Sequence, residues 1–136
     1  MRFLPLALMI FLVGCSRTSH DKDEAFYAIF RVAPDASVTV RQGKLWENRH
    51  FVFYEYYALV EFEASEEKVQ SLMNNMKTQF QPFDATGYGF GQKEDERWFA
   101  PDDGSKYFGW RSGDGVGVIV IRSSKTQRVY ALRSEL

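Results

Sequence analysis

The sequence is poor in the residues that most often mark a metal, a cofactor or a disulfide framework. It contains one cysteine and two histidines among 136 residues. A single thiol excludes an intrachain disulfide, so the stability of the chain must come from packing and hydrogen bonds. Because the His and Cys ligands of a zinc site are also too few, the sequence predicts neither a metal nor a cofactor.

The chain also lacks an excess of positive charge. Its 17 basic and 18 acidic side chains give a formal net charge of −1. No basic field exists that would attract phosphates, so the sequence predicts no nucleic-acid partner. What it does contain is 45% hydrophobic and 16% aromatic residues. This composition suits one domain with a strand-rich core.

The longest apolar run comes early and is short. Phe3–Val13 reads "FLPLALMIFLV", follows the basic residue Arg2 and precedes the small residue Gly14. A membrane-spanning helix needs about 20 apolar residues, so this run is too short to remain as a span. A basic start, a short apolar run and a small residue are the layout of a secretory signal. We therefore expect residues 1–14 to be a signal peptide that is removed.

The letters "LVGC" at Leu12–Cys15 resemble the lipobox of bacterial lipoproteins. In that family a signal peptidase cuts before the cysteine, and the thiol carries a diacylglycerol. The resemblance implies that Cys15 is lipidated and that the membrane is a partner through this anchor. A non-acidic residue after the cysteine, here Ser16, implies sorting to the outer membrane, with the domain facing the periplasm. The alternative is an ordinary buried cysteine, which packs as a small hydrophobe.

Beyond the cysteine, composition predicts a short tether and then one domain. Residues 15–24 are polar without periodicity, so they are expected to form a lipidated tether, with a single globular domain over 25–136. The segment "EAFYAIFRVAP" has apolar residues at helical spacing and predicts a possible short N-terminal helix. Ser65, two following glutamates and an apolar stripe predict an amphipathic helix over residues 65–78.

The remaining patterns predict strands. Alternation of apolar and polar residues indicates strands over residues 37–45 and within 51–63, the second with a bend or bulge. Shorter strands are expected in "RWFA", "SKYFGWR", "VGVIVIR" and "RVYAL", and a long loop over residues 81–96. The predicted fold class is α+β: an antiparallel meander of about five to six strands, with the 65–78 helix packed on one face.

Residues suited to an interface gather at predicted loop edges. Trp, Tyr and Arg are the side chains that most often anchor protein interfaces. The candidates for an interaction surface are Trp46, Arg49, His50, Tyr88, Phe90, Arg97, Trp98 and Trp110. They favour a non-enzymatic module that binds an envelope protein or another envelope component. The alternative interpretation is that the tryptophans pack in the core.

Two other functions remain open at this stage. An inhibitor or immunity-type lipoprotein would block a periplasmic enzyme through the loop at residues 84–96. A cell-wall or glycan hydrolase would use an acidic pair with His50. Its candidate carboxylates are Glu94, Asp95, Glu96, Asp102, Asp103 and Asp114. Nothing in the sequence selects two of them, and no Ca²⁺-loop frame contains them.

Overall fold

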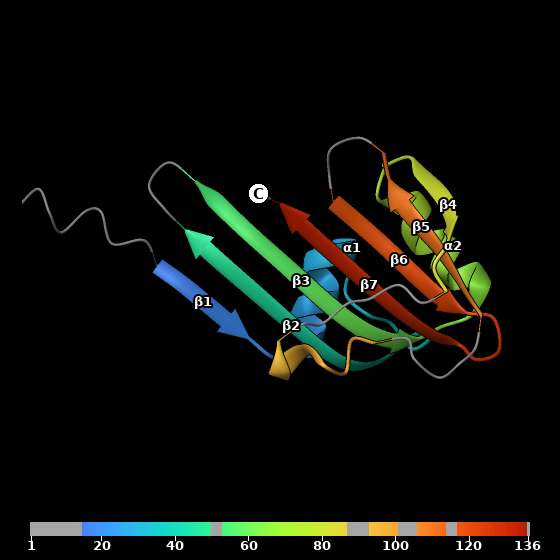
Figure 1. Cartoon of the computed structure of the whole chain (residues 1–136), viewed down its shortest axis with the longest axis horizontal. Coiled ribbons are helices and arrows are strands. Elements are labelled where there is room, and N and C mark those ends of the chain that lie inside the picture. The colour runs from blue at the N-terminus through green and yellow to red at the C-terminus, as the bar shows by residue number, and fades with distance from the viewer. Residues whose placement is uncertain (1–14, 50–52, 87–92, 101–105, 114–116, 136) are drawn as a thin grey trace, which may run out of the picture.

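A computed structural model describes residues 15–49, 53–86, 93–100, 106–113 and 117–135. Within these residues the chain forms one seven-stranded antiparallel sheet with two helices (Figure 1). The predicted α+β class is therefore confirmed, although the sheet has more strands than the five to six expected. The predicted signal peptide lies outside the described residues, as do His50, Tyr88 and Phe90.

The sheet consists of two meanders joined at their centre. The strand order across it is β1-β2-β3-β7-β6-β5-β4. The strands are β1 (Cys15–Ser19), β2 (Thr39–Arg49), β3 (Tyr54–Glu63), β4 (Phe80–Asp84), β5 (Tyr107–Ser112), β6 (Gly117–Ser123) and β7 (Arg128–Glu135). Strands β3 and β7 pair at the centre, so β1 and β4 form the two edges.

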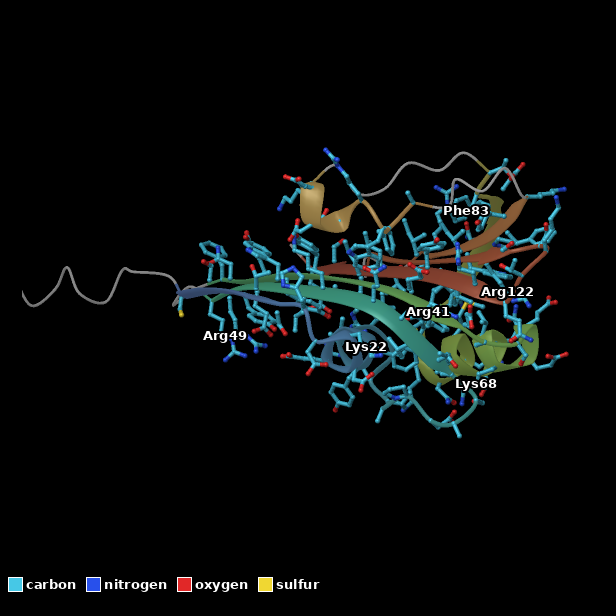
Figure 2. All side chains as sticks on the ribbon, turned by 90° about the horizontal axis from the view of Figure 1, so that it is seen from below. Lys22, Arg41, Arg49, Lys68, Phe83 and Arg122 are labelled. Carbon is cyan, nitrogen blue, oxygen red and sulfur yellow. The ribbon has the colours of Figure 1, made fainter. Side chains whose placement is uncertain are left out.

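The helices α1 (Lys22–Phe30) and α2 (Glu66–Asn75) cover one face of the sheet, which we call the helix face (Figure 2). The main core lies beneath them, where the rings of Phe26, Phe30 and Phe62 pack together. The α2 side chains Val69, Leu72 and Met73 belong to the same cluster. This confirms that the predicted 65–78 helix packs on the sheet. Its Ser65 hydroxyl caps the helix by accepting a hydrogen bond from the Lys68 amide.

The opposite face, which we call the loop face, carries a smaller core. The segment that includes the 3-10 helix η2 (Glu94–Glu96) lies over it (Figure 2). Phe99 from this segment is fully buried and contacts the ring of Tyr130 from β7 edge-on. The sequence predicted a strand at residues 97–100, but residues 97–98 form a turn and residues 99–100 have no regular secondary structure.

The predicted tether is instead part of the domain. Residues 15–19 pair with β2 as an edge strand, and α1 begins inside the remainder. The Asp21 carboxylate caps α1 by accepting hydrogen bonds from the amides of Asp23 and Glu24. The strand was not predicted because its residues are polar and show no periodicity. A short, exposed strand at the edge of a sheet needs few apolar residues. The helix ends at Arg31, whose φ of 61° is left-handed.

Two further predicted boundaries were wrong. Strand β2 continues beyond residue 45, where the predicted strand ended, to Arg49. Its register shifts between Val40 and Gln42, whereas the bend or bulge was predicted within the long second strand. Strand β4 overlaps the start of the predicted loop 81–96 and contains Pro82. Proline has no N–H to donate to a neighbouring strand, so it is tolerated here because β4 is an edge.

Candidate functional site

The structure divides the predicted interaction surface between the two faces of the sheet. Trp46 and the half-buried Trp98 lie on the loop face, and the exposed Arg97 belongs to the same covering segment. Trp110 lies on the helix face, where it packs against the main core. Arg49 is opposite Cys15 in the β1–β2 ladder, at one end of the sheet. The described candidates therefore fall into two separate sites, and Trp110 belongs to neither because it packs against the main core.

The first site is a cluster of charged residues on the loop face. The ammonium group of Lys44, whose side chain is only 4% exposed, lies 2.8 Å from Glu96 Oε1 and 2.8 Å from Asp95 Oδ2. The Tyr57 hydroxyl donates to Glu96 Oε1 at 2.7 Å. Lys93 Nζ donates to the same hydroxyl at 3.1 Å. We call these five residues the Lys44 cluster; it holds η2 against strands β2 and β3.

The charges in the Lys44 cluster stabilise one another. Burial alone would lower the pKa of Lys44, but hydrogen bonds to Asp95 and Glu96 outweigh it and raise that pKa above its ordinary value. The hydrogen bond from Lys44 lowers the pKa of Asp95. Lys44 therefore stays protonated at neutral pH, which suits it to hold carboxylates and not to act as a nucleophile or a base.

A cavity of about 310 Å³ opens beside the Lys44 cluster. Its lining residues are Tyr57, Leu59, Lys93, Glu96, Phe99, Leu132 and Ser134. The indole of Trp46 stacks on the Tyr57 ring, with centroids 5.5 Å apart and planes 23° from parallel. The site thus combines an apolar floor, a cationic rim and a half-exposed tryptophan, a composition that can receive an apolar or acidic group from a partner.

The sequence pointed to Asp95 and Glu96 only as candidate carboxylates, and it gave no sign that Lys44 lies beside them. Alternation from Val38 and Val40 would place residue 44 on the helix face, if the strand were regular. The register shift between Val40 and Gln42 moves Lys44 to the loop face and Leu45 to the helix core. A bulge moves every later side chain of the strand to the opposite face of the sheet, and no residue in this stretch predicts a bulge.

The second site is the end of the sheet that carries Cys15. Cys15 is exposed and is opposite Arg49 in the β1–β2 ladder, while Arg49 is opposite Tyr54 in the β2–β3 ladder. A hollow of about 340 Å³ is lined by Cys15, Arg17, Glu47 and Arg49. We call the ends of β1, β2 and β3 around these residues the Cys15 end. Directly opposed residues share a face, so the thiol and the Arg49 side chain lie on the same side of the sheet.

Glu47 organises the charges at the Cys15 end. Its carboxylate accepts hydrogen bonds from Arg17 Nε at 3.1 Å and from the Tyr54 hydroxyl at 3.0 Å. Burial acts to raise the pKa of Glu47, but these hydrogen bonds outweigh it and lower the pKa. The guanidinium of Arg49 lies over the Tyr54 ring, 5.6 Å from its centroid. Arg17 also pairs with Glu24 of α1, which joins β1 to the helix layer.

Among the residues that the structure describes, no group of three or more His, Cys, Asp and Glu side chains is placed to hold a metal ion. No helix in this part of the chain is both long and apolar enough to cross a membrane. Of the carboxylates proposed for hydrolysis, Asp95 and Glu96 share the ammonium group of Lys44. Asp102, Asp103 and Asp114 lie outside the described residues.

Comparison with known proteins adds no relative to this picture. No family model matches the chain, and neither a curated protein nor a solved structure matches it.

Proposed function

We propose that the chain is a membrane-anchored bacterial lipoprotein that is held at the cell envelope through a lipid on Cys15. The observation that carries this proposal is the position of the single cysteine, directly after the apolar run Phe3–Val13 and a small residue. In the lipobox that this segment resembles, the cysteine at this position is the one that carries the lipid. The exposure of Cys15 at the start of β1 supports it, because an acyl group there would displace no core residue.

The anchor can be tested by replacing the thiol. In a Gram-negative host, the wild-type chain is expected in the membrane fraction and in the detergent phase, because each buried methylene of an acyl chain contributes about 0.8 kcal/mol. Cys15→Ser removes the attachment atom, and it is exported behind a signal peptide that does not need the cysteine for its removal, so that the apolar run is also absent. This variant is expected in the aqueous phase. Ser16→Ala is the matched control and should stay with the membrane. Mass spectrometry of the N-terminal peptide identifies the lipid directly.

Two results would contradict the anchor. One is a wild-type peptide in which Cys15 carries no acyl group. The other is an unchanged distribution of Cys15→Ser between membrane and aqueous phases. Separation of inner and outer membranes in the same preparation tests the further proposal, based on Ser16, that the protein resides in the outer membrane and faces the periplasm.

We further propose that the anchored domain is a non-enzymatic binding module whose loop face receives an envelope partner. The supporting observation is the cavity beside the Lys44 cluster, with Trp46 half-exposed at Tyr57. Tryptophan and tyrosine are typical of interface anchors, and Trp46 and Tyr57 stand together here. An inhibitor or immunity-type role would be one form of this binding, in which the partner is a periplasmic enzyme.

A further inference from the structure

We propose that the Cys15 end of the sheet lies in the headgroup region of the membrane, so that the domain sits directly on the bilayer in one orientation. This inference rests on the proposed lipid anchor and adds what the anchored domain touches. It names the occupant of this surface as a lipid bilayer. The side chains that would meet the lipid are Arg49, Phe53 and Tyr54.

No flexible segment separates the proposed anchor residue from the sheet. Cys15 is itself the first paired residue of β1, opposite Arg49. A flexible tether of n residues lets a domain move roughly 5–6 Å × √n from its anchor, whereas a residue in the ladder allows no such distance. Acyl chains on this thiol would therefore hold the Cys15 end at the membrane surface.

Aromatic and basic side chains are exposed at the Cys15 end. Phe53 is 65% exposed and directly precedes β3, and Tyr54, the first residue of β3, is 47% exposed. The side chain of Arg49, 69% exposed, stacks on Tyr54. An aromatic ring with a polar tip and an arginine beside it suit the boundary between acyl chains and headgroup phosphates.

The helices that cover the sheet do not reach the Cys15 end. In Figures 1 and 2 the ends of β1, β2 and β3 extend past α1 toward the N-terminal side. Figure 2 shows Arg49 on this projecting part, away from α2. The rings of Phe53 and Tyr54 thus remain exposed in the folded domain, where contact with lipid would remove their apolar surface from water.

The test places the same environment-sensitive dye at two exposed aromatic positions. Phe53→Cys carries it at the Cys15 end, and Phe108→Cys carries it on β5. Phe108 is a matched control because it is also an exposed ring, at 47%, on a strand near the other edge of the sheet. Each full-length acylated protein is reconstituted in vesicles of phosphatidylethanolamine and phosphatidylglycerol. Quenching by aqueous iodide and by a lipid-attached quencher is then measured.

We expect the dye at position 53 to show several-fold weaker iodide quenching than the dye at 108, together with strong quenching from lipid. Equal iodide quenching at both positions in a lipidated protein would overturn this inference alone. Protection from iodide without quenching from lipid would indicate that a protein covers the Cys15 end, and would also overturn it. A chain without lipid on Cys15, recognised by mass spectrometry, would overturn the proposed anchor and this inference together.

Discussion

At the scale of single residues, Lys44 joins the segment that covers the loop face to the sheet. Its ammonium group is enclosed by Asp95, Glu96 and the Tyr57 ring. The Glu96 carboxylate is itself nearly buried, so it relies on Lys44 and on the Tyr57 hydroxyl for compensation. A buried ion pair contributes little relative to apolar packing, yet removal of one partner leaves the other charge uncompensated.

Lys44→Met is therefore expected to lower the free energy of unfolding by about 3 kcal/mol, the magnitude typical of a broken buried pair. Denaturant unfolding measures this loss. Lys68→Met is the control, because the pair of Lys68 with Asp35 is on the surface and its loss should be much smaller. Replacing both Lys44 and Glu96 by Met should recover much of the stability. Equal losses for Lys44→Met and Lys68→Met would contradict this account of the cluster.

At the scale of elements, the close packing of α1 on β2 depends on a glycine. A Cβ built on Gly43 would lie 2.7 Å from the Lys22 Cα and 2.8 Å from the Ala25 Cβ. The first of these atoms belongs to the helix backbone, so it cannot move without shifting the helix. Gly43 therefore sets how near α1 approaches the sheet, in the region of Lys22 that Figure 2 labels.

Gly43→Ala is expected to destabilise the fold by about 1–3 kcal/mol, because overpacking forces the backbone to shift. Thermal unfolding of the purified chain gives the value. Gly113→Ala serves as the comparison, since the nearest heavy atom to its added Cβ is 3.8 Å away. A Gly43 variant as stable as the Gly113 variant would show that α1 does not pack as described.

The elements also show how far the sequence was informative. Helix 65–78 was predictable because a capping serine, first-turn carboxylates and an apolar stripe agree. The α+β class followed from the same patterns. The edge strand β1 and the Lys44 cluster were not predictable, since one rests on backbone pairing of polar residues and the other on a bulge in β2. Both depend on contacts between distant segments, which local patterns do not record.

At the scale of the whole molecule, the two candidate sites lie close together. Tyr54 at the Cys15 end and Tyr57 at the cavity are three residues apart on β3. At about 3.3 Å of rise per residue this is roughly 10 Å along the strand. If the Cys15 end rests on the bilayer, a partner bound on the loop face is itself held near the headgroups. Such a partner would be another membrane protein or a component of the adjacent envelope.

Binding on the loop face can be tested with a photoreactive amino acid in living cells. Placed at Trp46, beside the cavity, it is expected to give a discrete crosslinked product. Placed at Tyr27, an exposed ring on α1 and hence on the helix face, it should give none. Trp46→Ala should abolish capture of the same partner by a probe at Lys93. Similar products from positions 46 and 27, or none from 46, would contradict the assignment of the loop face.

The pairing of Cys15 in β1 also determines how the domain carries mechanical force. The hydrogen bonds between antiparallel strands run perpendicular to the strand axes. A pull on Cys15 along β1 therefore loads all the pairings from Cys15 to Ser19 at once, in shear, and does not peel them one after another. Arg17 and Ser19 transfer part of that load to Glu24 of α1. If a partner holds the loop face while force is applied to the lipid anchor, all the β1–β2 pairings therefore oppose that force together.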